Sequence, residues 1–167
     1  YRFEIVADYG VFRDLQRHRL LTIEWQPLTP DLGFDTPPEI GEIGVESEWN
    51  ATMDRCRALY DELRSATSPT VAQYIVPMAF NIRFSMEMNA REALHVIELR
   101  TTEQAHRTYR SICLEMHRLI REQAGHHAIA DAMRFVGGES SGLERLKAEE
   151  RTEQRRAALS ARKAGQA

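Results

Sequence analysis

The sequence predicts an α+β fold in which a small, mainly antiparallel sheet packs with several amphipathic helices. Two observations favour this class: short segments alternate apolar and polar residues, and longer segments repeat apolar residues at helical spacing. The chain has 167 residues, 43% of them hydrophobic, which suits one cored domain of common size. We therefore expect one domain over residues 1–136 and a charged tail over residues 137–167.

The first predicted element is a short strand near the start of the chain. Phe3 and Ile5 alternate with Arg2 and Glu4, and this pattern ends near Ala7. Alternation of this kind is typical of a strand that buries one face and exposes the other.

A helix is expected next, because Asp8 is suited to cap its first turn. Its apolar positions begin at Val11 and continue to Leu20. The triplet Arg17-His18-Arg19 is therefore predicted to lie in the later turns of this helix.

Residues 27–44 contain four prolines and three glycines, which block regular structure and predict a long loop. An amphipathic helix follows and ends before Ser68-Pro69. Its inward residues share helical spacing and are Trp49, Met53, Cys56, Tyr60 and Leu63.

Residues 80–88 form the clearest strand, because apolar and polar residues alternate throughout. Asn89 is suited to cap the helix that follows, on which Arg91 and His95 share one side. The predicted buried side of that helix comprises Ala93, Leu94, Val96, Ile97 and Leu99.

After Arg100, a break at Thr101-Thr102 separates this helix from another that is expected to reach about Gln123. A last helix is expected over residues 128–136. The inward residues of the longer helix are Ala105, Tyr109, Ile112, Cys113, Met116 and Ile120. Beyond Glu139 the chain is charged and poor in large apolar residues, as in a solvated helix or a disordered tail.

The composition excludes several classes of protein. The formal net charge is −3, and the chain lacks an apolar run long enough to span a membrane. Basic residues of the tail are interleaved with glutamates, which disfavours nucleic-acid binding. We expect a cytoplasmic protein with neither a membrane nor a nucleic-acid partner. Because the chain opens at Tyr1 without a methionine, we also expect the N-terminal part of the domain to be missing.

Cations and hydrogen-bond donors are concentrated at a few places in this slightly acidic chain. They are the triplet Arg17-His18-Arg19, then Asn89 and Arg91, and finally Arg100. This concentration favours a small anionic ligand over a polyanion. Each signal also has a simpler explanation: a solvated basic turn for the triplet, an exposed pair for Arg91 and His95, and a C-terminal helix cation for Arg100.

These residues, in this order and spacing, resemble the flavin-dependent thymidylate synthases. The resemblance covers residues 1 to about 136, and the residues that carry it are the stretch from Phe3 to the triplet, Pro77 with the strand at 80–88, Asn89-Ala90-Arg91 and Leu99-Arg100. It implies the thymidylate synthase-complementing fold and an enzyme that uses FAD to methylate dUMP to dTMP, with methylenetetrahydrofolate and NADPH as co-substrates. It also implies a homotetramer, or one half of a tandem protein.

By the matched positions, the resemblance implies a role for each cationic residue. Contacts with FAD would come from Arg17, His18, Arg19, Asn89, Arg91 and His95. Arg17 and Arg100 would bind the substrate, and Arg100 would be catalytic. Turning C5 of uracil into a nucleophile places negative charge on N3 and O4, which a fixed guanidinium stabilises.

The chain departs from the family pattern mainly on the nucleotide side. Pro27 replaces a serine, Thr29-Pro30 replaces Arg-Tyr, and Gln73 replaces an arginine. A glutamine ahead of the triplet is Asp14, and a late histidine is replaced by Gln104, with His106 nearby. Two hypotheses therefore remain open: a working synthase, or a degenerate copy with a structural or flavin-binding role.

Other motifs favour structural roles. Cys56 and Cys113 match neither a disulfide framework nor a zinc pattern, and both lie on apolar helix stripes as inert thiols. His95, His106 and His117 recur at intervals that would separate them by about 16 Å along a helix axis, so no metal site is expected. Trp25 and Trp49 could stack on a ligand, but packing is the preferred interpretation.

Overall fold

The computed structural model describes residues 1–137 and 150–156 of the chain. These fall into two compact units, Tyr1–Met88 and Asn89–Ala167. The predicted α+β class is confirmed. Of the predicted tail, residues 150–156 are helical, whereas 138–149 and 157–167 lie outside the described residues.

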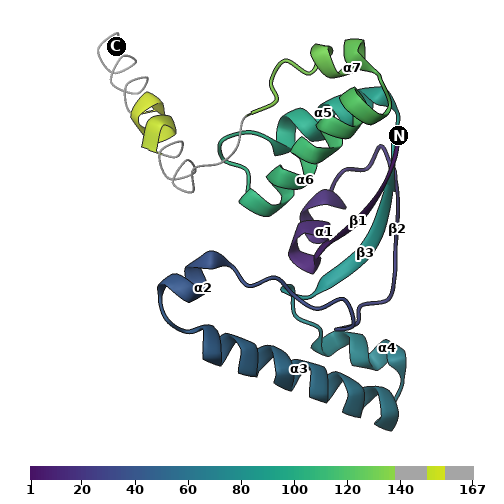
Figure 1. Cartoon of the computed structure of the whole chain (residues 1–167), viewed down its shortest axis with the longest axis vertical. Coiled ribbons are helices and arrows are strands. Elements are labelled where there is room, and N and C mark those ends of the chain that lie inside the picture. Colours follow the sequence, from purple (N-terminus) through teal and green to yellow (C-terminus); the bar gives the residue numbers. More distant parts are fainter. Residues whose placement is uncertain (138–149, 157–167) are drawn as a thin grey trace, which may run out of the picture. The chain divides into compact units, whose positions relative to one another are not determined.

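The N-terminal unit is built around a three-stranded antiparallel sheet in the order β1-β3-β2 (Figure 1). The strands are β1 (Arg2–Asp8), β2 (Thr22–Trp25) and β3 (Asn81–Glu87). The predictions of β1 and β3 are confirmed. Strand β2 was not predicted, because an alternation over four residues is too short to be recognised without knowledge of the partner strand.

The sheet has one buried face and one polar face. Phe3, Ile5 and Ala7 of β1 are buried on the same side as Ile82, Phe84 and Met86 of β3. The helix α1 (Tyr9–Leu15) packs on this side, with the Phe12 and Phe84 ring centroids 5.2 Å apart. The alternation seen in the sequence therefore specifies which side of the sheet becomes the core.

Helix α1 is shorter than predicted, since it ends at Leu15 and not at Leu20. Its start is as expected: the Asp8 carboxylate accepts a hydrogen bond from the Val11 N–H at 2.8 Å. The helix ends because the next inward positions belong to His18 and Arg19, so the apolar stripe stops. The chain then turns to enter β2.

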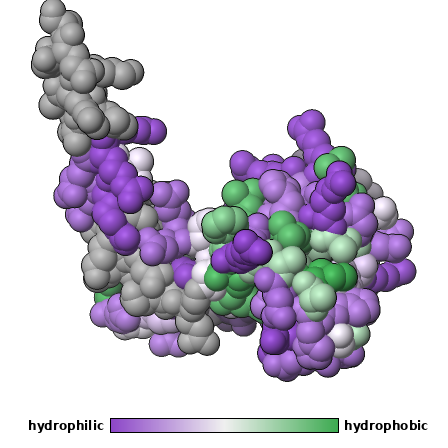
Figure 2. All heavy atoms as spheres, turned by 90° about the horizontal axis from the view of Figure 1, so that it is seen from above, coloured by the Kyte–Doolittle hydropathy of each residue, from purple (hydrophilic) through white to green (hydrophobic). Residues whose placement is uncertain are grey.

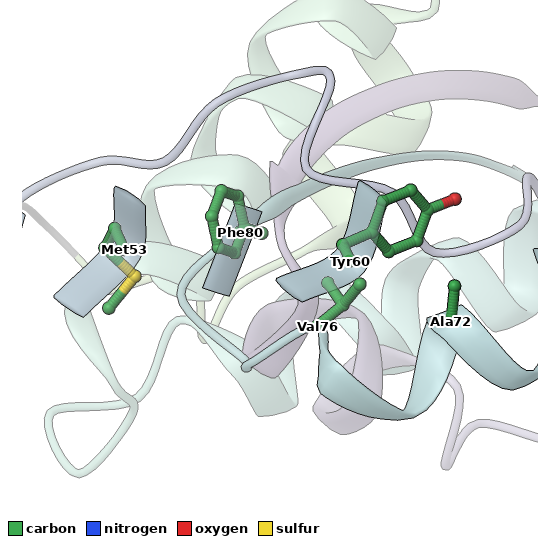
Figure 3. Packing of buried hydrophobic residues seen from close by; sticks show 5 residues of the cluster. All are labelled: Met53, Tyr60, Ala72, Val76 and Phe80. Carbon is green, nitrogen blue, oxygen red and sulfur yellow. The ribbon is translucent and has the colours of Figure 1, made fainter. Parts of the chain in front are cut away.

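A second core of the N-terminal unit joins the long helix α3 (Glu46–Ala66) to the segment that precedes β3. That segment contains the helical turns α4 (Pro69–Ala72) and η1 (Gln73–Ile75). Figure 3 shows Met53 and Tyr60 of α3 beside Ala72, Val76 and Phe80. The predicted α3 stripe is confirmed, whereas the predicted loop contains a short helix, α2 (Pro38–Glu42), with proline in its first turn.

The C-terminal unit contains α5 (Ala90–Arg100), α6 (Arg107–Arg118), a π-helical turn η2 (Leu119–Gln123) and α7 (His127–Ala132). One detail of the prediction for α5 is wrong, since Leu99 is 48% exposed. Glu92, for which no burial was predicted, is buried. The buried stripe runs through Ala93, Val96 and Ile97, and Leu99 lies to the side of it.

Helix α7 ends at Ala132, earlier than the predicted residue 136, and the chain continues along the end of α5. The Phe135 N–H donates to the Glu98 carboxylate at 3.1 Å, and the Gly137 N–H donates to the Thr101 hydroxyl at 3.2 Å. A Cβ atom at Gly137 would lie 2.1 Å from the Thr101 carbonyl oxygen. Only glycine therefore permits this close approach.

The surface is mostly hydrophilic, with hydrophobic residues gathered in one region of the face shown in Figure 2. In the described ranges 1–137 and 150–156, none of the helices combines the length and apolar character needed to cross a membrane.

We predict that Phe84→Ala lowers the free energy of unfolding of the N-terminal unit by about 3–5 kcal/mol, because Phe84 is fully buried at the centre of the sheet. Val6→Ala, at an exposed position of β1, should cost less than about 1 kcal/mol. Urea unfolding followed by the fluorescence of Trp25 and Trp49, both in this unit, measures the difference. Equal losses for the two variants would contradict the assigned core.

Candidate functional site

The triplet Arg17-His18-Arg19 lies in the turn that joins α1 to β2. The His18 N–H donates to the Leu15 carbonyl at 3.2 Å, which closes this turn. The His18 side chain is buried, whereas Arg17 and Arg19 on either side of it are exposed. The turn thus presents two guanidinium groups to the surface on either side of an anchored histidine.

The charge of Arg17 is partly offset within the turn region. Its Nε lies 3.6 Å from the Asp14 carboxylate, and both side chains are substantially exposed. An exposed ion pair of this kind contributes little to stability, but it competes with an external anion for the guanidinium. Arg19 is therefore the stronger candidate of the two for binding an anion.

Asn89 caps helix α5, as predicted. Its side-chain oxygen accepts a hydrogen bond from the Glu92 N–H at 2.9 Å. Arg91 and His95 are exposed one helical turn apart on the same side of α5, Arg91 in the first turn and His95 in the middle of the helix. The Asn89 amide and the Arg91 guanidinium therefore lie at the start of the helix, and His95 continues the same side.

Arg100 is on a different side of α5. It follows Ala93 and Ile97 at the spacing of the buried stripe, and its side chain is half-buried. Its guanidinium carbon lies 5.3 Å from the centroid of the Tyr109 ring on α6, a cation–π contact. Arg100 is thus a packed arginine and not a solvated cation at a helix end.

Tyr109 contacts more than Arg100, since its ring centroid is 6.1 Å from that of His106. His106 caps α6, with its Nδ1 accepting a long hydrogen bond of 3.4 Å from the Thr108 N–H. Gln104 is exposed in the preceding turn. From the sequence, Tyr109 is expected only as a core residue. A helix break separates Tyr109 from Arg100, so the sequence spacing gives no signal of their contact.

Cys113 lies on the inward side of α6 with no exposed surface. Burial raises the pKa of its thiol to about 12, and the nearby positive charge of Arg100 opposes this only in part. Cys56 is partly exposed and packs beside the α3 core. The prediction of an inert core thiol agrees with this environment of Cys113.

Gln73, which replaces an arginine of the resembled family, lies against Leu28 in the N-terminal unit. The Gln73 side-chain oxygen accepts a hydrogen bond from the Leu28 N–H at 2.9 Å. Both residues line a hollow of about 390 Å³, which we call the neutral hollow, because the side chains around it carry no formal charge: Tyr9, Leu28, Thr70, Gln73, Tyr74 and Val76.

The polar face of the sheet carries a second hollow of about 280 Å³. Its charged side chains pair across the strands: Arg2 lies 3.7 Å from Glu24, and Arg83 lies 2.8 Å from Glu4. Because opposite charges alternate there, this surface is not a cationic anion site.

The remaining candidates are histidines that could bind a metal ion and tryptophans that could stack on a ligand. His95 and His117 belong to different helices, and the described part of the chain holds no group of three or more side chains able to share a metal ion. The Trp25 and Phe12 ring centroids are 5.3 Å apart, and Trp49 packs against the α3 core. Both tryptophans therefore have packing roles.

The structure assigns the candidate residues to two groups. Arg17, His18 and Arg19 lie in the N-terminal unit, and Asn89, Arg91, His95 and Arg100 lie in the C-terminal unit. Within the C-terminal unit, Arg91 and His95 share one surface of α5, and Arg100 faces α6. Exposed arginines such as Arg17 and Arg19 in the first unit and Arg91 in the second are each suited to an anionic ligand.

Comparison with known proteins shows the family of this chain. The family model described as thymidylate synthase complementing protein matches residues 1–126, and the chain belongs to this family. A UPF0159 protein of Chlamydia muridarum is 38% identical over 151 residues, covering 90% of this chain and 28% of that protein. A UPF0159 protein of Thermoplasma acidophilum is 38% identical over 152 residues, covering 90% of this chain and 30% of that protein.

A flavin-dependent thymidylate synthase of Geobacter sulfurreducens is 36% identical over 76 residues, which cover 46% of this chain and 32% of that protein. The chain spans less than a third of the length of these curated relatives.

We predict that the two thiols differ sharply in reactivity. At pH 8, a disulfide reagent such as Ellman's reagent should modify Cys56 in the folded chain and leave Cys113 unmodified, because burial and the raised pKa keep Cys113 a neutral thiol. The Cys56→Ser variant should react only after denaturation. Rapid reaction of folded Cys56→Ser would contradict the assigned environment of Cys113.

Proposed function

We propose that the protein to which this chain belongs methylates dUMP to dTMP with bound FAD, using methylenetetrahydrofolate as the one-carbon donor and NADPH as the reductant. We also propose that it acts in the cytoplasm, as a homotetramer or beside a tandem partner domain. Membership of the thymidylate synthase complementing family supports this, as does the relative named as a flavin-dependent thymidylate synthase. The observation that carries the proposal is the exposed set of guanidinium groups described above.

The donor set fits the pyrophosphate of FAD in its chemistry. Arg17, Arg19 and Arg91 are exposed, and guanidinium groups bind phosphate oxygens through paired charge-assisted hydrogen bonds. His95 adds a ring nitrogen, and the Asn89 amide keeps its N–H donors because its oxygen caps α5. His18 anchors the turn that carries Arg17 and Arg19.

Arg100 is the proposed catalytic residue. When C5 of the uracil ring becomes nucleophilic, negative charge develops on N3 and O4, and guanidinium N–H groups can donate hydrogen bonds to these atoms. The contact with Tyr109 restricts the guanidinium, so less ordering is needed as the charge develops. Arg17 is the second proposed substrate contact, although Asp14 competes for it.

This chemistry does not require a protein thiol. When bound, FAD would carry the one-carbon unit, whereas a cysteine-dependent synthase needs a thiolate as the nucleophile that activates the uracil ring. Cys113 could not supply that thiolate, because it is buried and its pKa is raised to about 12.

A second candidate function is a flavin-binding or structural domain without synthase activity of its own. The contact between Gln73 and Leu28 favours it, because it uses the Leu28 N–H within the chain. In the resembled family, an arginine stands at the position of Gln73. Here Gln73 lines the neutral hollow, whose side chains offer no cation to a substrate phosphate.

We predict that Arg100→Ala lowers tritium release from dUMP labelled at C5 by about 10²–10³-fold in the full-length protein, as expected for the loss of one charge-stabilising donor. Arg64→Ala is the matched control, because Arg64 is also an arginine in the last turn of a helix and is exposed on α3. Its activity should equal that of the natural protein.

The same preparation separates the two candidate functions. A yellow protein that binds FAD and releases no tritium would support the second candidate. A colourless protein that takes up no added FAD would overturn the synthase and the flavin-binding role and leave only the structural one. Undiminished release by Arg100→Ala would overturn the role of Arg100.

A further inference from the structure

We propose that residues 133–137, which we call the strap, hold the Arg100 guanidinium in position, with Thr101 and Gly137 as the positioning residues. The strap follows α7 and belongs to the C-terminal unit, beyond the residues 1–126 that the family model matches. The inference rests on the role proposed above for Arg100, because Thr101 and Gly137 would act through that arginine and would not touch a ligand themselves.

The strap is attached to the C-terminal end of α5 by its main chain. At its start Met133 is buried, and at its end the Gly137 N–H donates to the Thr101 hydroxyl at 3.2 Å. Between them, the Phe135 N–H donates to the Glu98 carboxylate at 3.1 Å, whereas the Phe135 side chain is 77% exposed. Backbone hydrogen bonds, and not the aromatic ring, therefore make the attachment.

Thr101 is the residue at which the strap meets the helix. It has no exposed surface, and its hydroxyl donates to the Ile97 carbonyl at 2.8 Å while it accepts from the Gly137 N–H. The Thr101 N–H donates to the same Ile97 carbonyl at 3.0 Å. The strap is thus part of the hydrogen bonding that closes the last turn of α5. Leaving a buried polar group without its partner is costly, so this attachment resists opening.

Gly137 also lies close to a buried side chain of α6. A Cβ atom at Gly137 would lie 2.1 Å from the Thr101 carbonyl oxygen and 3.3 Å from Nη2 of Arg110. Arg110 is only 3% exposed, so its guanidinium has little freedom to move aside. The strap therefore contacts the end of α5 and lies beside α6 at the same residue.

These two anchors are next in sequence to the two members of the cation–π contact. The guanidinium carbon of Arg100 lies 5.3 Å from the centroid of the Tyr109 ring. Thr101 is the residue after Arg100, and Arg110 is the residue after Tyr109. The strap thus fixes the backbone from which both side chains project. A long arginine side chain has many rotamers, so a fixed backbone and a fixed ring reduce the ordering that is needed as charge develops on a substrate.

The first test measures how accessible the Arg100 guanidinium is. Phenylglyoxal, which modifies arginine side chains, is applied to the full-length protein as isolated, and modification is quantified by peptide mass spectrometry. Gly137→Ala should raise the rate at Arg100 by about fivefold or more, the order expected for the loss of one hydrogen bond, because the new Cβ atom displaces the strap. The rate at Arg64, which is exposed on α3, should not change.

Matched variants separate the strap from a general effect of substitution. Gly41→Ala is the control, because a Cβ atom there meets nothing within 4 Å, and it should leave the rate at Arg100 unchanged. Thr101→Val removes the hydroxyl that accepts from Gly137 and should raise the rate, whereas Thr101→Ser keeps the hydroxyl and should stay within about twofold of the natural rate. The Thr101 pair decides the question if Gly137→Ala fails to fold.

The second test asks whether the strap acts through Arg100. In the full-length protein, Gly137→Ala should lower tritium release from dUMP labelled at C5 by about tenfold, because the guanidinium must be ordered again in each turnover. In the Arg100→Ala variant, the same substitution should have no further effect, since the group that the strap positions is absent. A merely structural role would lower release by the same factor in both backgrounds.

Three results would overturn the proposal: an unchanged rate at Arg100 in Gly137→Ala and Thr101→Val, an equal rise in Gly41→Ala, or an equal loss of tritium release with and without Arg100. The phenylglyoxal measurement requires neither FAD nor turnover. A natural protein that releases no tritium would therefore overturn the proposed synthase activity, whereas the rate at Arg100 would still decide whether the strap holds this side chain.

Discussion

The pairing of β3 with a strand on each of its edges is the constraint on which the N-terminal unit depends. β3 buries Ile82, Phe84 and Met86 on one side, and this requires partners in fixed register. The pairing extends to the end of the chain, since the Tyr1 amino group donates to the Met88 carbonyl at 2.7 Å. Because β1 and β2 occupy opposite edges, the chain between them must cross the sheet. Helix α1 makes that crossing over the buried face, and the Arg17-His18-Arg19 turn completes it.

Because the triplet lies in the turn that leads from α1 to β2, it can serve both the fold and a ligand site. His18 is buried and closes the turn, so the two exposed arginines are carried by a segment whose position the sheet register determines. In such a turn the backbone that carries the donors is in place before a ligand binds. A basic turn in a free loop would lack this property, although its sequence could be identical.

The elements with a clear period could be predicted from the sequence, and those fixed by tertiary partners could not. The stripe of α3, the alternation of β3 and the cap at Asn89 are local patterns, and each was predicted correctly. β2 exists because β3 has a second edge to fill, which four residues cannot reveal. The end of α1 was placed too late because Leu20 was counted as core, whereas it is 76% exposed.

The candidate site also has features that a local sequence pattern predicts and features that depend on tertiary contacts. The cationic residues could be selected from their order and spacing in the sequence, but the side-chain contacts that determine their roles could not be predicted. Arg100 continues a buried stripe and meets Tyr109 across a helix break, and Gln73 meets Leu28 from a distant part of the chain. Both contacts depend on packing that no local pattern encodes. Gln73 also changes the chemistry, because it stands where the resembled family has an arginine and lines a hollow without formal charge.

The central claim is that exposed guanidinium groups of this chain bind the phosphates of a flavin dinucleotide. The most direct measurement compares FAD with riboflavin, which has the same ring and lacks the pyrophosphate, by titration of flavin fluorescence. The account predicts that FAD binds at least about tenfold more tightly and that Arg19→Ala with Arg91→Ala removes this advantage. Equal affinity for the two flavins, or no uptake of either, would contradict it.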